Sequence, residues 1–102
     1  MWKKIVAEFS NNPRDVQTQP ITNKNPSWFY VHVIGENVYV EAAKNHDNSC
    51  SIEIPRKLNP SEFEKMLDIY HRRNAGEKVS REATAVTINQ VYWYGVFAEM
   101  KI

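Results

Sequence analysis

The clearest structural signal in the chain is the segment 28–43, WFYVHVIGENVYVEAA. Both ends of this segment are dense in aromatic and β-branched residues, which suit the pleated surface of a strand. The tripeptide GEN at 35–37 lies between them and has the composition of a tight turn. We therefore predict a β-hairpin with strands at 28–34 and 38–43.

Two segments on either side of the hairpin alternate between apolar and polar residues, as half-buried strands do. These segments are 3–9 and 50–54, and Pro55 ends the second one. Their apolar positions are Ile5, Ala7 and Phe9 in the first and Cys50, Ile52 and Ile54 in the second. Together with the hairpin, they predict an antiparallel β-meander of about four strands.

Residues 10–27 separate the first two of these strands. They contain three prolines and four asparagines, and their only large apolar residues are Val16 and Ile21. Proline cannot donate to a strand ladder, so this composition favours a long loop. Loops of this length in compact domains are commonly functional or poorly ordered.

Residues 59–76 have the start and stop signals of a helix. Asn59 can accept a hydrogen bond from the first turn, Pro60 has the backbone angle of the first helical position, and Gly76 can end the helix. The apolar residues of one helical face are Phe63, Met66, Leu67 and Tyr70. This spacing predicts an amphipathic helix over about residues 60–74, packed on one face of the sheet.

The last segment, 79–102, has two interpretations. Residues 84–88 and 91–97 are rich in β-branched and aromatic residues, which favours a pair of strands. Against this, Ser80 or Thr87 can serve as an N-cap, and apolar residues recur at helical spacing. These residues are Val91, Tyr94, Ala98 and Ile102. We favour the helix, and the chain as a whole is expected to have an α+β fold with an aromatic-rich C-terminal helix or strand pair.

The composition indicates one globular domain spanning residues 1–102. Of the 102 residues, 42% are hydrophobic and 25% are charged, which differs from the profile of a disordered chain. The net charge of +1 is too small to drive non-specific binding to nucleic acid or membranes. The longest uncharged run, 83–98, is too short and too polar to span a bilayer.

The residues that carry chemistry are few and scattered. Cys50 is the only cysteine, so no intrachain disulfide can form, and a reducing cytoplasm is the expected compartment. One cysteine and three histidines lack the spacing of a zinc site, and three distant glycines cannot form a phosphate-binding loop. We therefore expect no bound metal and no cofactor.

One grouping could form a Cys/His nucleophile pair, namely Cys50 with His46, next to Asp47, and with His32 on the hairpin. Cys50 alternates in phase with Ile52, however, so we interpret it as a small core residue. We assign no catalytic residue, and a small enzyme or ligand-binding domain is the third alternative.

Two aromatic clusters, at 28–30 and 92–97, exceed what a small interior can cover on every side. Tyr and Trp are enriched at interface hot spots, and symmetric self-association is a common way to cover an apolar patch. We therefore expect a non-catalytic interaction module that forms a homo-oligomer, or binds another protein, through the aromatic C-terminal segment. The candidate interface residues are Trp28, Tyr30, Tyr92, Trp93, Tyr94 and Phe97.

Residues 76–94, GEKVSREATAVTINQVYWY, support an alternative function. This segment resembles the helix-turn-helix of resolvase-like DNA binders, in which a small residue inside the first helix precedes a Thr- or Ser-capped second helix. The resemblance implies a sequence-specific DNA-binding regulator that uses residues 76–100. In that case Thr87 caps the recognition helix, Asn89 and Gln90 face base edges, and Lys78 and Arg81 contact phosphates.

Overall fold

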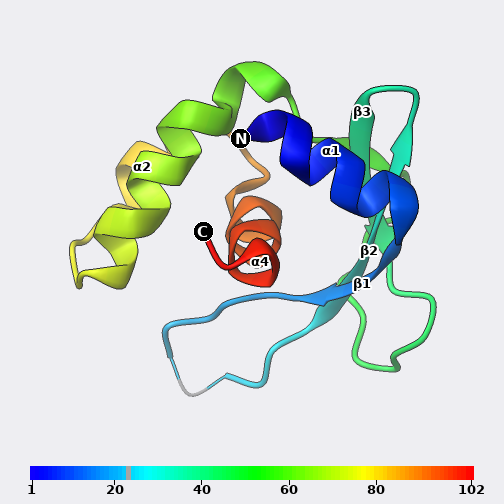
Figure 1. The fold of residues 1–102 in the computed structure, drawn as a ribbon. Coiled ribbons are helices and arrows are strands. Elements are labelled where there is room, and N and C mark those ends of the chain that lie inside the picture. The colour runs from blue at the N-terminus through cyan, green and yellow to red at the C-terminus, as the bar shows by residue number, and fades with distance from the viewer. Residues whose placement is uncertain (23) are drawn as a thin grey trace.

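The structure is a computed structural model that describes residues 1–22 and 24–102 (Figure 1). It has four helices and a four-stranded antiparallel sheet among these residues, so the predicted α+β fold is confirmed. In chain order the elements are α1 (Trp2–Asn11), β1 (Arg14–Gln17), β2 (Trp28–Ile34), β3 (Asn37–Ala42), β4 (Arg56–Lys57), a short 3₁₀ turn η1 (Pro60–Glu62), α2 (Phe63–Asn74), α3 (Ser80–Val86) and α4 (Gln90–Met100). Asn23, inside the predicted 10–27 loop, lies outside the described residues.

The sheet is a meander in which the strands follow the order β1-β2-β3-β4. β2 and β3 form the predicted hairpin, with Val31 opposite Val40 and His32 opposite Tyr39. Gly35 opens the hairpin turn with a φ of 64°, a left-handed conformation that strains residues with side chains.

The predicted loop at 10–27 contains an edge strand. Arg14–Gln17 forms β1 and pairs with β2, so that Asp15 lies opposite Tyr30. Val16 is buried and anchors this strand to the core. The three prolines of the segment, at positions 13, 20 and 26, all lie outside β1 and leave its hydrogen bonds intact.

The predicted strand at 50–54 is wrong. The chain makes one parallel bridge just before it, between Ser49 and Trp28, and the fourth strand begins only after Pro55. Ile52 packs into the core and Cys50 against it, but Ile54 is 76% exposed. The alternating apolar pattern at 50–54 therefore arises from a loop that directs two side chains, Cys50 and Ile52, toward the core.

The predicted strand at 3–9 is also wrong, because these residues belong to α1. Ile5 and Phe9 are fully buried, while Ala7 is exposed. Two residues four positions apart share one face of a strand and also one face of a helix, so this pair satisfies both patterns. Trp2 and Val6, partly buried beside them, complete the helical face.

η1 and α2 together form the predicted amphipathic helix. The Asn59 side chain accepts a hydrogen bond from the Ser61 backbone N–H at 3.1 Å, as expected of a residue that starts a helix. Phe63, Met66 and Tyr70 are buried on one face. Gly76 follows the helix with a φ of 96°, in agreement with its predicted role at the end.

The C-terminal segment is helical, so the favoured interpretation is confirmed and the strand pair is wrong. The expected caps are also wrong, because Val79 and Asn89 hold the N-cap positions of α3 and α4. Thr87 Oγ1 instead accepts the Asn89 N–H at 3.0 Å within the turn. α4 lies between the sheet and α2 (Figure 1), and its buried surroundings make it apolar on nearly every side. Its helical periodicity is therefore weak.

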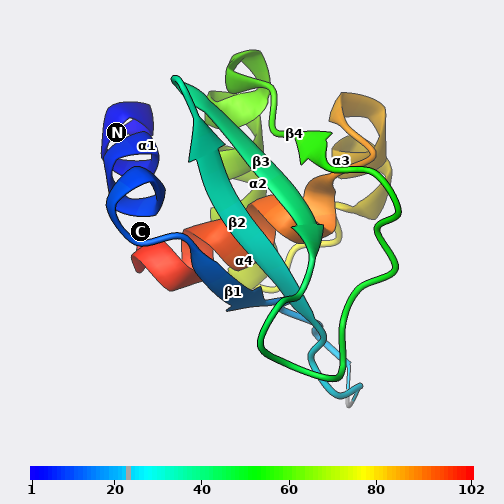
Figure 2. The same ribbon diagram turned by 90° about the vertical axis from the view of Figure 1, so that its right-hand side faces the viewer.

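The described residues form two layers (Figure 2). The helical layer lies on one side of the sheet, where α1 and α4 pack on the strands and α2 packs on the far side of α4. The core between the sheet and these helices contains Phe29, Val31, Val38 and Val40 from the strands. The opposite sheet face looks toward the viewer in Figure 2, and no helix of the described residues crosses it. None of these helices is long and apolar enough to cross a membrane.

Candidate functional site

The aromatic residues of α4 mostly face the interior. Trp93 and Phe97 are fully buried and Tyr94 is 6% exposed. Phe97 packs with its ring centroid 5.3 Å from that of Tyr70 on α2. The Trp93 indole N–H donates to Glu62 Oε1 at 3.3 Å, so its one polar group is also satisfied within the chain. These three candidate interface residues are therefore part of the core. A charged substitution at Trp93 would disturb folding, so it cannot report on an interface.

Tyr92 is half-buried on the side of α4 that faces the strands and the 50–56 segment. Its ring meets that of Phe29 edge-on at 5.1 Å, and the Arg56 guanidinium lies 5.6 Å from its centroid. Burial raises the pKa of Tyr92, the nearby Cys50 thiol raises it further, and Arg56 lowers it. Tyr92 therefore presents little free ring surface to a partner.

The face of the sheet opposite the helices, which we call the open sheet face, carries two tyrosine rings and a histidine ring. We use this name for five residues: Tyr30 and His32 of β2, Tyr39 and Glu41 of β3, and Lys57 of β4. Strand register puts His32 beside Tyr39, Tyr39 beside Lys57, and Tyr30 beside Glu41. These side chains point away from the core because they alternate with buried residues along each strand.

The rings of the open sheet face lie in a row. The centroids of Tyr30 and His32 are 5.6 Å apart with their planes at 30°, and those of His32 and Tyr39 are 5.8 Å apart with their planes at 24°. His32 Nε2 lies 2.8 Å from Glu41 Oε2 without the alignment of a hydrogen bond. The Lys44 ammonium lies over the Tyr30 ring, 4.4 Å from its centroid. The row is a series of stacked rings bordered by charges of both signs.

Trp28 lies on the same side of the sheet but is covered by the loop that follows β3. The His46 ring stacks on it with centroids 3.4 Å apart and planes 7° apart. The His46 Nδ1 lies 2.7 Å from Asp15 Oδ2, and the Lys44 and Asn45 backbone N–H groups donate to the same carboxylate. Asp15 thus fastens this loop to β1, and the loop shields Trp28.

The Asp15 carboxylate is held in its charged form. Burial by itself raises the pKa of Asp15, but the hydrogen bonds from Lys44, His46 and Asn45 outweigh burial. The pKa therefore lies below its ordinary value of 3.8. This role of Asp15 could not be predicted from the sequence, because its three partners lie 29 to 31 residues away in the chain.

Among the residues that the structure describes, Cys50 has no base positioned to activate it. His46 is fixed to Asp15 through Nδ1, while the Cys50 backbone N–H donates to Trp28. Burial raises the pKa of the Cys50 thiol, which keeps it protonated and weakly nucleophilic at neutral pH. In the described part of the chain, no group of three or more His, Cys, Asp or Glu side chains could hold a metal ion.

Helices α3 and α4 are joined by the three residues 87–89, a turn length that suits a helix-turn-helix. From Trp93 through Phe97, however, α4 is buried, and Gly95 lies against the Gln17 backbone and the Phe29 ring. A recognition helix must lie in the major groove, so only the exposed start of α4 could approach DNA. Asn89 is already engaged there, because its Oδ1 accepts from Arg56 Nη1 at 3.2 Å.

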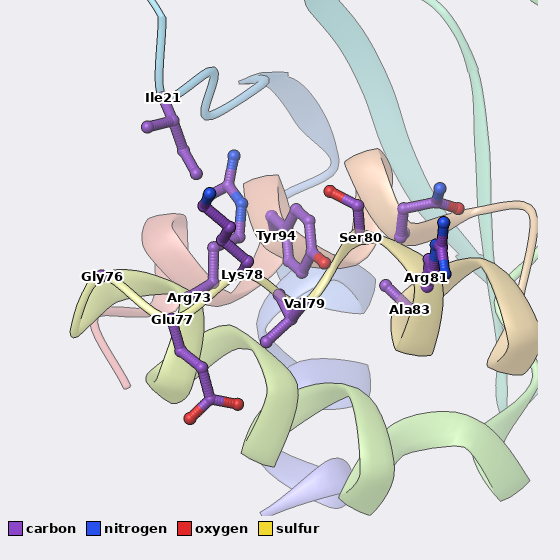
Figure 3. Close-up of a pocket in the computed structure, with 11 residues that line it drawn as sticks. Ile21, Arg73, Gly76, Glu77, Lys78, Val79, Ser80, Arg81, Ala83 and Tyr94 are labelled. Carbon is purple, nitrogen blue, oxygen red and sulfur yellow. The ribbon is translucent and has the colours of Figure 1, made fainter.

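The other three DNA-contact candidates line one pocket (Figure 3). Lys78, Arg81 and Gln90 surround it together with Arg73 and Tyr94. Its volume is about 680 Å³, and it lies between the end of α2, the segment leading into α3, and Ile21. These three residues of the sequence motif therefore do lie close together. They line a pocket and do not form an exposed surface along a recognition helix.

Comparisons with known proteins add no functional information. No protein-family model matches the chain, and no curated protein or solved structure shows significant similarity to it. We therefore infer function from the open sheet face and the pocket.

Proposed function

We propose that this chain is a non-catalytic interaction module that pairs with a second copy of itself through the open sheet face. The observation that carries the proposal is the row of rings formed by Tyr30, His32 and Tyr39 on the side of the sheet without helices. Tyrosine supplies large contact area at little cost in side-chain entropy, which makes such a row suited to an interface. The aromatic surface available for association is thus on the sheet, while that of α4 is used in the core.

The charges on the open sheet face are complementary to those of a second copy of the chain. A two-fold interface brings the same patch of both copies together, so a patch that carries one sign of charge repels itself. The open sheet face carries both signs, with Lys57 on β4 and Glu41 on β3. A two-fold axis between these strands would set Lys57 of each copy against Glu41 of the other. The net charge of +1 adds little long-range repulsion.

The test is a charge-exchange experiment read by size-exclusion chromatography with light scattering. We expect the wild type to elute at twice 11.9 kDa. Lys57→Glu should weaken the dimer by placing like charges together, and the double variant Lys57→Glu, Glu41→Lys should restore it. Each interfacial pair is expected to change the dissociation constant by about tenfold.

The matched control is Lys65→Glu, a charge reversal on the exposed face of α2. It should leave the dimer unchanged, and circular dichroism should show the same fold for all variants. A wild-type protein that stays monomeric at high micromolar concentration contradicts the proposal. A dimer that is insensitive to Lys57→Glu places the interface elsewhere.

Sequence-specific DNA binding is the second candidate, supported by the three-residue turn between α3 and α4 and by the nearby cations Lys78 and Arg81. Its test is a band-shift selection with random duplexes at low salt. Enrichment of one sequence by the wild type, lost in Gln90→Ala, would favour DNA recognition over self-association as the main function.

A further inference from the structure

We propose that the pocket lined by Arg73, Lys78 and Arg81 binds a small phosphate ester of about nucleotide size. The pocket lies in the helical layer and does not involve the open sheet face, so this site is independent of the proposed self-association. The phosphate groups would contact Lys78 and Arg81, and the organic part of the ligand would lie toward Ile21 and Tyr94.

Acidic and basic side chains are separated from one another around the pocket. Three nearby carboxylates, those of Asp68, Glu77 and Glu82, all bind one guanidinium, that of Arg72. The pKa of Arg72 is raised accordingly, mainly by Glu82 and then by Glu77. Glu77 also lines the pocket, and Figure 3 shows its carboxylate directed away from Ile21. These three acids are thereby paired with Arg72, which does not line the pocket.

The cations around the pocket keep no such partner. Arg73, Lys78 and Arg81 form no ion pair with any residue that the structure describes. Three cations around one opening with no carboxylate bound to them favour an anion of more than one charge. Phosphate fits this requirement because its several oxygens can be shared by an ammonium and a guanidinium.

One of the three cations is held in place before any ligand arrives. Arg73 Nη2 donates to the Gln19 carbonyl at 2.5 Å, and the guanidinium lies over the Tyr94 ring, 4.4 Å from its centroid. These contacts fix Arg73 between α2 and the segment after β1. Lys78 and Arg81 are exposed and have no comparable contact among the described residues, so a ligand can recruit both without breaking existing bonds.

The shape and the remaining walls fit a small organic phosphate. A volume of about 680 Å³ lies within the range of roughly 300–1,000 Å³ typical of small-molecule sites. Val79 and Ala83 are apolar parts of the wall, and Ile21, which is 73% exposed, overhangs the opening in Figure 3. Burying the Ile21 side chain against a ligand would add apolar contact to the charge recognition.

The experiment is calorimetric titration of the whole chain with pyrophosphate and with ATP at low salt. We expect both probes to bind the wild type, and Lys78→Gln and Arg81→Gln each to weaken binding by about tenfold, the effect of losing one charge-assisted contact. Both residues are exposed, so the variants should keep the wild-type fold by circular dichroism. The matched control is Lys65→Gln on the exposed face of α2, which should bind like the wild type.

Two results would overturn the proposal. One is the absence of binding up to millimolar concentrations of both probes, or binding that Lys78→Gln and Arg81→Gln do not change. The other is obtained with a short DNA duplex or single strand. If the oligonucleotide binds through Lys78 and Arg81 while ATP and pyrophosphate do not, the cations contact a nucleic-acid backbone and the small-ligand site is wrong. Lys57→Glu should leave ATP binding unchanged, which separates this test from that of self-association.

Discussion

Gly95 lies in the middle of α4 at a point where the helix has no room for a side chain. A β-carbon at this position would lie 2.7 Å from the Gln17 carbonyl oxygen and 2.7 Å from the Phe29 ring. Both distances are well inside van der Waals contact, and the first involves backbone that cannot rotate away. The missing side chain therefore allows α4 to pack directly on β1 and β2.

Gly95→Ala should destabilise the protein, although the same change inside a helix usually stabilises it by about 1 kcal/mol. The β-carbon must push α4 away from the sheet, and we expect the free energy of unfolding to fall by about 1 to 3 kcal/mol. Urea denaturation of the variant and the wild type measures the difference. A variant at least as stable as the wild type would show that α4 can shift at no cost.

The structural roles of individual residues differ in how well they could be predicted from the sequence. Asn59 and Gly76 were predictable because their roles depend on neighbours within a few positions. Gly95 and Asp15 were not, because what they contact is distant in the chain. The strand alternation also places Tyr39 and His32 on one face of the hairpin, but Tyr39 was not among the predicted interface residues and His32 was considered only as a partner of Cys50.

At the scale of elements, the errors follow from apolar patterns that fit two structures. Ile5 and Phe9 satisfy both strand and helix spacing, and only the burial of Trp2 and Val6 distinguishes the two. α4 presents the opposite difficulty, because a helix packed on several sides loses its polar face and resembles a buried strand. The hairpin and α2 were predicted correctly because each has one buried and one open face, together with local turn or cap signals.

One side chain of β1, that of Asp15, accepts three of the hydrogen bonds that hold the loop at 43–49. The Asp15 carboxylate, whose side chain is only 2% exposed, accepts hydrogen bonds from Lys44 and Asn45 and pairs with His46. Asp15→Ala would leave these donors without their acceptor, and we expect a loss of about 1 to 3 kcal/mol in the free energy of unfolding. His46 should also leave Trp28, which a change in tryptophan fluorescence would report.

The contribution of Asp15 should depend on pH with a defined sign. Its pKa is lower in the folded protein than the ordinary 3.8, so the folded state favours the charged form. The difference in stability between the wild type and Asp15→Ala should be complete above that ordinary value and decrease as pH falls through the lower folded pKa. Asp15→Asn, which keeps one acceptor oxygen without the charge, is the control. A difference that is independent of pH down to strongly acid solution would contradict the role of the charge.

At the scale of the whole molecule, the two layers have different surfaces. The uncovered face of the sheet mixes rings with both signs of charge, while the pocket in the helical layer gathers cations whose neighbouring acids bind Arg72. The net charge of +1 conceals this separation, because it sums charges that lie on different sides of the molecule. The composition therefore shows that the molecule has no strong overall electrostatic field, but it could not predict a local cluster of cations around a pocket.

In native-state hydrogen exchange, the backbone amides should fall into slow and fast groups according to how deeply each element is buried. β2 is hydrogen-bonded to strands on both sides, and α4 is buried from Trp93 through Phe97, so their amides should exchange only on global unfolding. α3 has seven residues and one buried side chain, Ala83, so its amides should exchange faster through local opening. In the 43–49 loop, the Lys44 and Asn45 amides should be protected in the wild type and lose that protection in Asp15→Ala. Nuclear magnetic resonance measures each amide separately, and α4 amides that exchange as fast as those of α3 would show that the C-terminal helices open without unfolding the sheet.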